Sequence, residues 1–253
     1  MLLITDLDKT IVYSRTDGND CCVERKGEVP VTYMTYNAVC LLNELIETQK
    51  FSIIPCTLRS FEQTQRIDFT HNGTLPFIIC DNGFSIYRNG ILDEQWDNYV
   101  QSIINTSDVI LLYDKMSKVI EDKKIPLKMF KNNRNGFISI IFHDKEESHM
   151  YAEKLLELVD ISKYKIANQG KKIYVIPKQL DKAIAVNYIK ELLKSEQIVT
   201  SGDSSVDAEF TKLGDYIILP KHATFQHQNA IITQHEGIEA GEEILNNIKE
   251  IMK

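Results

Sequence analysis

The stretch LLITDLDKTIV, residues 2–12, joins a strand-like apolar run to two acidic side chains. The apolar residues at 2–5 are typical of a buried β-strand, yet Asp6 and Asp8 follow directly, with one leucine between them. A carboxylate that is buried in a protein destabilises the fold unless it is paired, hydrogen-bonded or bound to a metal. Another part of the fold must therefore offset this cost.

Four further apolar runs have the length and composition of strands buried on both faces. They are FSIIPC (51–56), PFIIC (76–80), QIVTS (197–201) and DYIIL (215–219). Residues 35–50 and 181–194 repeat apolar side chains with the period of an α-helix. Ser60, followed three positions later by Gln63, predicts a capping box that opens another helix. Strands that alternate with helices predict an α/β fold: a Rossmann-like, doubly wound core with a mainly parallel sheet.

The middle of the chain has a different pattern and predicts an inserted α+β domain. Asn89-Gly90 lies between alternating residues, which is the strongest short-range signal for a β-hairpin with a type I′ turn. Helical stretches, a strand and a second hairpin around Gln169-Gly170 follow. We therefore expect an inserted domain at residues 84–178, with residues 1–83 and 179–253 forming the core domain.

Composition excludes several classes of protein. The chain has 253 residues, with 29 basic against 36 acidic side chains, and its formal net charge of −7 disfavours non-specific nucleic-acid binding. No window approaches the roughly 20 apolar residues that span a bilayer. A secretory signal is not expected either, because a basic n-region is missing. The five cysteines fit no zinc or disulfide pattern and predict reduced thiols in a cytoplasmic protein.

Polar residues and glycines follow the apolar runs where each predicted strand ends. They are Asp6 and Asp8, then Thr57 and Arg59, then Asp81, Asn82 and Gly83, and finally Gly202, Asp203 and Asp207. Each of them alone is compatible with a helix cap or a turn. In open α/β sheets, however, ligands bind at the carboxyl ends of the strands. The set would bring several carboxylates, a hydroxyl and a base to one edge of the sheet.

The ordered set resembles the haloacid dehalogenase (HAD) superfamily of phosphatases. The match lies in DLDKT (6–10) for the DxDxT motif, in Thr57, in Lys182 of LDKAIA, and in GDSSVD (202–207) for the GDxxxD element. The inserted domain stands where that superfamily places a cap domain of its second type (C2B-like). NG at 82–83, the Asn89-Gly90 hairpin and YIILPKHA (216–223) are similar to the sugar-phosphatase branch, which includes Cof-type, sucrose-phosphate and mannosyl-3-phosphoglycerate phosphatases.

The resemblance implies a Mg²⁺ site at the end of the first strand. The ligands would be the carboxylate of Asp6, the backbone carbonyl of Asp8 and the carboxylate of Asp203, with Asp207 binding directly or through water. Oxygen ligands of this kind suit Mg²⁺, and no cluster of His and Cys favours zinc. Ser204 and Val206 replace asparagines that are frequent in this loop of the superfamily, so the water shell around the metal is expected to differ.

The resemblance also implies a catalytic role for four side chains. Asp6 would be the nucleophile that forms an aspartyl-phosphate, and Asp8 would protonate the leaving alcohol and later accept a proton from water. Thr57 would hydrogen-bond the transferring phosphoryl group, while Lys182 would neutralise its charge and orient Asp6. Lys178 is a rival for the lysine role, although the Ala-Ile-Ala after Lys182 better matches the expected helix start.

Substrate specificity is expected to come from the cap. Candidate substrate-binding residues are Arg59, Asn82, Arg134, Gln169, Lys171 and Lys172. A solvated turn is the alternative for the polar hairpin tips. Arg59 could instead contact the cap or pair with an acidic residue. The leading hypothesis is a Mg²⁺-dependent phosphatase of a small phosphorylated metabolite, such as a sugar or polyol phosphate. A sugar phosphomutase and a non-catalytic phosphometabolite-binding protein remain open. We expect no nucleic-acid or membrane partner, and the oligomeric state stays undetermined.

Overall fold

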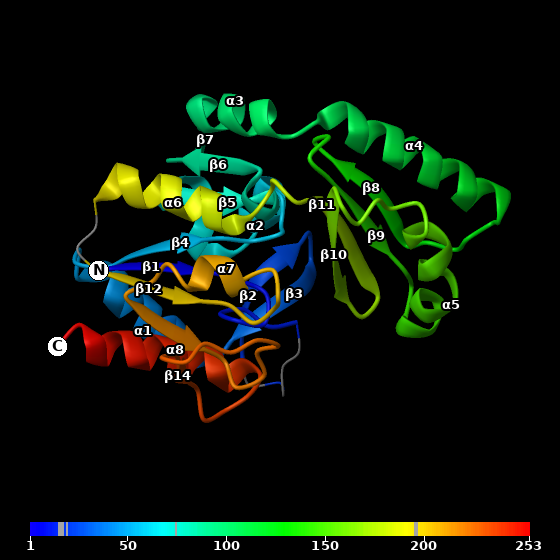
Figure 1. Cartoon of the computed structure of the whole chain (residues 1–253). Coiled ribbons are helices and arrows are strands. Elements are labelled where there is room, and N and C mark those ends of the chain that lie inside the picture. Colours follow the sequence, from blue (N-terminus) through cyan, green and yellow to red (C-terminus); the bar gives the residue numbers. More distant parts are fainter. Residues whose placement is uncertain (15–17, 19, 74, 195–196) are drawn as a thin grey trace. The chain divides into compact units, whose positions relative to one another are not determined.

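The computed structural model describes residues 1–14, 18, 20–73, 75–194 and 197–253 and divides the chain into two compact units (Figure 1). Unit 1 comprises Met1–Trp96 and Asp181–Lys253, and unit 2 comprises Asp97–Leu180. The predicted α/β fold with an inserted α+β unit is confirmed. No described helix is both long enough and apolar enough to cross a membrane.

A parallel five-stranded sheet forms the centre of unit 1, in the order β14-β13-β12-β1-β4. The strands are β1 (Leu2–Thr5), β4 (Ser52–Pro55), β12 (Ile198–Ser201), β13 (Tyr216–Leu219) and β14 (Ile231–Ile232). Leu2 lies opposite both Ser52 and Ile198, so β1 is paired along both edges. This pairing explains the near-continuous burial of β1, whose four residues are all buried.

The run at 76–80 forms a strand, β5 (Phe77–Cys80), which is linked to the segment after β4 by an isolated parallel bridge between Cys56 and Ile79. Its main partner is β6 (Ser85–Arg88), which pairs antiparallel with β5 and with β7 (Ile91–Leu92). Asn89 and Gly90 both have positive φ at the β6–β7 turn, as a type I′ hairpin requires. These strands belong to unit 1, so unit 2 begins at Asp97, whereas the sequence suggested residue 84.

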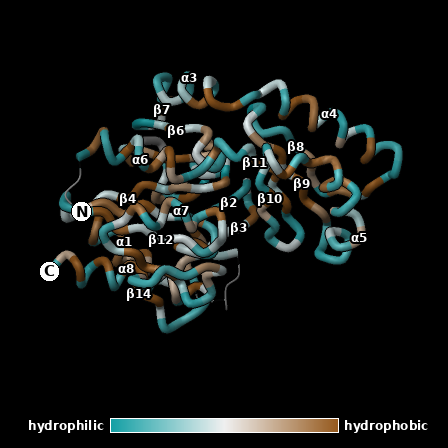
Figure 2. The backbone as a smooth tube through the Cα atoms, viewed as in Figure 1, coloured by the Kyte–Doolittle hydropathy of each residue, from teal (hydrophilic) through white to brown (hydrophobic). Residues whose placement is uncertain are grey.

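Helices cover both faces of the central sheet. Figure 1 shows α1 (Tyr36–Glu47) and α8 (Ile238–Ile251) on one side and α6 (Lys182–Leu193) on the other. In Figure 2 the helices alternate between apolar and polar residues along their length, which is the pattern of a helix with one buried face. Ala38, Leu42 and Leu45 of α1 share a buried cluster with Ile244 and Ile248 of α8.

Side-chain caps fix where three helices of unit 1 begin. Thr35 accepts a hydrogen bond from the backbone of Ala38 and caps α1. Ser60 and Gln63 form the predicted capping box at α2 (Phe61–Thr64). Asp181 accepts from the backbone of Ala183 and sets the first turn of α6. The next residue after this cap, Lys182, is therefore held at a defined position at the start of the helix.

Shorter elements surround the end of β1. The strands β2 (Cys21–Lys26) and β3 (Val29–Met34) form an antiparallel hairpin. Backbone hydrogen bonds between Tyr13 and Tyr33 join this hairpin to the segment that follows β1. The remaining elements are the 3₁₀ helices η1 (Asp68–Gly73) and η2 (Asp81–Gly83) and the short helix α7 (Ala208–Thr211). Glu24 of β2 forms a bridge with Ile67, which brings the hairpin against the segment after α2.

Unit 2 is a separate α+β fold. Its sheet, β10-β11-β9-β8, is antiparallel throughout. The strands are β8 (Met129–Asn133), β9 (Phe137–Ile141), β10 (Tyr164–Gln169) and β11 (Lys172–Pro177), and the helices are α3 (Glu94–Ile103), α4 (Thr106–Asp122) and α5 (Lys145–Leu156). α3 begins within unit 1. The predicted second hairpin is confirmed, because Gln169 pairs with Lys172 across Gly170.

Candidate active site

Lys182 joins two of the predicted acidic residues. Its Nζ lies 2.8 Å from Oδ1 of Asp6, which follows β1, and 2.7 Å from Oδ1 of Asp207, which follows β12. The lysine side chain is fully buried, and its ammonium group also lies 5.5 Å from the ring centroid of Phe210. The ion pair between Lys182 and Asp6 offsets part of the free-energy cost of burying the Asp6 carboxylate at the end of β1.

Asp203 adds a third carboxylate to the cluster. Asp6, Asp203 and Asp207 each offer an oxygen within 4.8 Å of the other two, and all three residues are buried. Burial and the neighbouring Asp207 raise the pKa of Asp203 to about 7. Burial also raises the pKa of Asp6 well above its ordinary value, against the lowering effect of Lys182. When all three carboxyls are ionised, the acidic triad carries more negative charge than one ammonium group neutralises, so the triad could hold a divalent cation.

The loop after β12 fixes Asp207 in place. Oδ2 of Asp207 accepts from the backbone N of Ser204 at 2.9 Å and from its hydroxyl at 2.8 Å. A Cβ on Gly202 would lie 2.5 Å from the Cβ of Asp207, so only glycine fits there. The serine that replaces a frequent asparagine thus orients an acidic side chain, a role that the sequence motif alone did not indicate.

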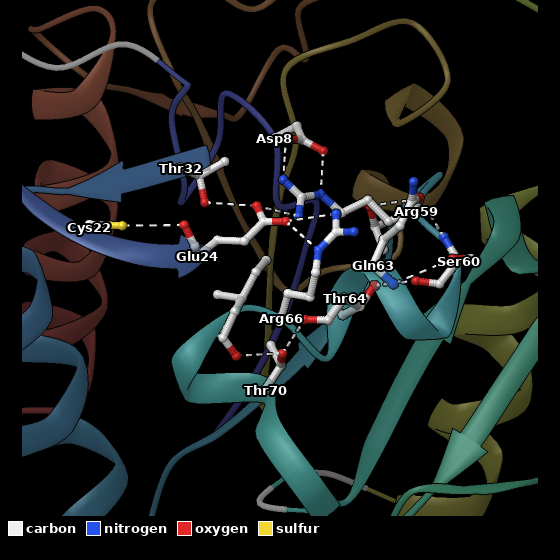
Figure 3. A network of polar contacts seen from close by, with 12 residues as sticks. Asp8, Cys22, Glu24, Thr32, Arg59, Ser60, Gln63, Thr64, Arg66 and Thr70 are labelled. Carbon is white, nitrogen blue, oxygen red and sulfur yellow. Dashed lines mark hydrogen bonds and ion pairs between the residues drawn. The ribbon is translucent and has the colours of Figure 1, made fainter. Parts of the chain in front are cut away.

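Asp8 points to a different partner from Asp6. The Arg59 guanidinium binds its carboxylate through two hydrogen bonds of 2.7 Å, from Nε to Oδ2 and from Nη2 to Oδ1 (Figure 3). The third nitrogen, Nη1, donates to Glu24 at 2.8 Å. Burial lowers the pKa of Arg59, but Asp8 and Glu24 together raise it above its ordinary value. Arg59, for which the sequence left open a substrate contact or a pair with an acidic residue, therefore pairs with two carboxylates.

Thr57 and Asn82 occupy the ends of the next two strands. Thr57 is buried and accepts from the backbone N of Arg59 at 3.2 Å, while its carbonyl accepts from the backbone N of Asn82 at 3.0 Å. Among the residues that the structure describes, the buried side-chain amide of Asn82 has no hydrogen-bond partner. A Cβ on Gly83 would lie 2.9 Å from the carbonyl oxygen of Asp181, which places this turn against the start of α6.

The other predicted residues lie in unit 2. Gln169, Lys171 and Lys172 gather at the β10–β11 hairpin, where Lys171 donates to the carbonyl of His143 at 3.3 Å. Arg134 lies in the β8–β9 turn and forms an ion pair of 2.9 Å with Asp97. Lys178, the rival lysine, is also part of unit 2, whereas Lys182 contacts the carboxylates of unit 1 directly.

Glu24 is a buried polar residue that the sequence patterns did not single out. It lies in β2, in a run of mixed polar and apolar residues, and its side chain is fully buried. Its partners Arg59, Arg66 and Thr32 lie 35, 42 and 8 residues away in the sequence. No regular spacing in the sequence therefore indicates that Glu24 is buried.

The sequence and the fold are similar to those of known phosphatases. The family model for sucrose-6F-phosphate phosphohydrolase matches residues 1–219. Comparison with curated proteins gives no significant match. The solved sucrose-phosphatase of Synechocystis, in complex with sucrose and phosphate, is 17% identical with a TM-score of 0.62, and the match covers 98% of each chain.

Two further solved structures share the fold. The C-terminal domain of trehalose-6-phosphate phosphatase from C. albicans is 13% identical with a TM-score of 0.65, covering 98% of this chain and 91% of that one. A HAD/COF-like hydrolase from Plasmodium vivax is 16% identical with a TM-score of 0.65, covering 99% and 95%. These likenesses establish the fold, and the family model, which spans most of the sequence, establishes the family. The chain belongs to the sucrose-6F-phosphate phosphohydrolase family of HAD-type phosphatases, which are phosphoric monoester hydrolases.

Proposed function

We propose that this protein is a Mg²⁺-dependent phosphatase that hydrolyses a small sugar or polyol phosphate through an aspartyl-phosphate on Asp6. The observation that carries the proposal is the buried contact of Lys182 with Asp6 and Asp207, beside Asp203. A nucleophilic carboxylate needs positive charge around it when it approaches an anionic phosphate. The lysine supplies one part of that charge.

The acidic triad fits Mg²⁺ in its donor chemistry. All of its donors are carboxylate oxygens, the ligands that this hard cation prefers. Asp6, Asp203 and Asp207 would hold the ion, together with the backbone carbonyl of Asp8. When bound, the ion would neutralise charge on the substrate phosphate and on the attacking carboxylate.

In the first step, an oxygen of Asp6 attacks phosphorus, and the bond from phosphorus to the sugar oxygen breaks. Lys182 keeps the attacking carboxylate in a fixed orientation by binding its Oδ1. Asp8 gives its proton to the leaving alkoxide oxygen, so the product departs as an alcohol. Thr57 and the amide of Asn82 would donate hydrogen bonds to the phosphoryl oxygens.

In the second step, water attacks the phosphorus of the aspartyl-phosphate, and the bond from phosphorus to Asp6 breaks. Asp8, now ionised, accepts the proton of that water, which restores its protonated form and releases inorganic phosphate. The same side chain thus serves as acid and then as base. Positive charge from Lys182 stabilises both transition states.

The inserted unit would select the substrate, acting as a cap. The polar residues at the β10–β11 hairpin, Gln169, Lys171 and Lys172, are candidate contacts to sugar hydroxyls, with Arg134 as a further candidate. Support for a sugar as the phosphorylated molecule comes from the family model and from the sucrose- and trehalose-phosphate phosphatases that share the fold.

The direct test measures phosphate release from a panel of phosphorylated sugars, polyols and nucleotides, with Mg²⁺ and with EDTA. We expect Mg²⁺-dependent release of one free phosphate per sugar produced. Asp6→Asn should abolish labelling by ³²P-substrate, whereas Asp8→Asn should slow turnover and leave Mg²⁺ binding intact. Transfer of phosphate to a second sugar without release, or full activity of Asp6→Asn, would contradict the proposal.

A further inference from the structure

Glu24 is a buried carboxylate outside every motif of the proposed mechanism. Its side chain has 0% exposure, and four donor atoms bind it (Figure 3). Oε1 accepts from Nε and Nη2 of Arg66 at 3.0 and 2.9 Å. Oε2 accepts from Nη1 of Arg59 at 2.8 Å and from the hydroxyl of Thr32 at 3.1 Å. The β2–β3 hairpin therefore carries a fully satisfied anion toward Arg59.

Arg59 is held at both its backbone and its side chain. Its backbone N donates to Thr57, and its carbonyl accepts from the backbone N of Asp81 at 2.9 Å. Its guanidinium plane lies between Glu24 and Asp8, with one nitrogen on the former and two on the latter. A planar guanidinium that is fixed in this way defines the plane and direction of the carboxylate that it binds.

Asp8 needs such support because its side chain is 48% exposed. An exposed carboxylate samples several rotamers unless a partner restrains it. A group that transfers a proton must lie within hydrogen-bond distance of the reacting oxygen, and a small misplacement slows the reaction strongly. When Asp8 is ionised, as it is before it accepts the proton of water, the charges in this network also balance, because two carboxylates face the guanidinium groups of Arg59 and Arg66.

We propose that Glu24, acting through Arg59, is a positioning residue for the carboxylate of Asp8. This inference rests on the proposed function, which gives Asp8 the proton transfers. It also assigns Arg59 to the orientation of Asp8 instead of to the substrate, because each of its three guanidinium nitrogens already binds a carboxylate. A purely structural buried anion would affect the stability of the fold and leave the chemical step unchanged.

The first test compares kcat and KM of Glu24→Gln with those of the unchanged protein, on whichever sugar phosphate it hydrolyses. We expect kcat to fall about 10-fold to 100-fold, with KM changed by less than about 2-fold. Thr32→Val removes another hydrogen bond to the same oxygen of Glu24 and serves as the control inside the network. Glu44→Gln makes the same chemical change at the exposed ion pair with Lys249 and serves as the second control.

A double-mutant cycle tests whether Glu24 acts through Arg59. In the Arg59→Gln background, Glu24→Gln should lower kcat by less than about 2-fold, because the link to Asp8 is already broken. Circular dichroism and thermal unfolding of each variant establish that it is folded. Additive losses of kcat in the cycle, or a rise of KM at constant kcat, would overturn the inference.

The leaving group supplies a readout that a structural role would not move. The rate of Asp6 phosphorylation should fall strongly in Glu24→Gln with a sugar phosphate, whose alkoxide needs a proton. It should fall far less with p-nitrophenyl phosphate, whose nitrophenolate leaves without one. An equal fall of the phosphorylation rate on both substrates would overturn the proposed role of Glu24 and leave the proposed function standing. If the protein without substitutions hydrolyses no phosphate monoester, the proposed function is overturned, and the role of Glu24 with it.

Discussion

The acidic triad should make the metal-free protein less stable as the pH rises from 5 to 8. Burial and the charge of Asp207 raise the pKa of Asp203 from 3.8 to about 7 in the folded protein. In the unfolded chain the same carboxyl keeps its ordinary pKa. A carboxyl with a raised pKa binds its proton more tightly when the protein is folded. Its stabilisation is therefore complete below about pH 4 and is lost as the pH rises through about 7.

These two pKa values set the size of the effect. Linkage gives a loss of about 3 kcal/mol in the free energy of unfolding between pH 5 and pH 8 for Asp203. Mg²⁺ at a concentration 100-fold above its Kd should restore about 2.7 kcal/mol at pH 8. At pH 5 it should restore much less, because the protonated carboxyl is a poor ligand.

Urea unfolding at the two pH values, in EDTA and in Mg²⁺, measures both quantities. Trp96, the only tryptophan of the sequence, reports on unit 1, since its buried indole donates to the carbonyl of Gly83 at 3.0 Å. Asp203→Asn is the matched control, because asparagine keeps the size of the side chain and cannot ionise. In EDTA, the unchanged protein should lose about 3 kcal/mol relative to this variant between pH 5 and pH 8. A difference that stays constant, or grows in favour of the unchanged protein, would refute the reasoning.

Three further substitutions probe single contacts of the site. Lys182→Met should lower the free energy of unfolding by about 3–5 kcal/mol in metal-free urea titrations, because it leaves buried carboxylates unpaired; an unaltered midpoint would contradict this. Gly202→Ala would push a Cβ to 2.5 Å from the Cβ of Asp207 and displace it. Its Mg²⁺ affinity, measured by calorimetry, should fall about 10-fold or more, and an unchanged Kd would argue against Asp207 as a ligand. Asn82→Gly keeps the positive φ of 59° and removes the unpartnered amide. KM for the phosphorylated substrate should rise about 10-fold with no loss of thermal stability; an unchanged KM would remove Asn82 from the binding site.

Sequence reasoning predicted the acidic cluster because its residues follow the ends of strands. Short apolar runs indicate buried strands, and the polar residues after them must then meet at one sheet edge. This logic placed Asp6, Asp203 and Asp207 together, and the structure has the three within one cluster. The choice of Lys182 over Lys178 depended on the expected helix start, which the cap at Asp181 provides.

The sequence patterns did not predict which strands pair with each other or which distant residues contact each other. An apolar run does not reveal which neighbour it will pair with, so nothing indicated that β5 would turn antiparallel onto β6 and extend unit 1 to Trp96. Glu24 likewise looks like an ordinary polar residue of a hairpin strand. Its burial follows from partners supplied by the segment around Arg59 and Arg66, which only the folded chain brings to it.

The parallel pairing of Leu2 with Ile198 delays assembly of the carboxylate cluster during synthesis. Unit 2 is contiguous and can close its antiparallel sheet from contacts within Asp97–Leu180. A nascent chain that has not yet reached β12 holds Asp6 without Asp203 or Asp207, and one edge of β1 has no partner. An open strand edge of this kind promotes aggregation. We therefore expect the ribosome-bound intermediate to be more prone to aggregation than the complete folded chain.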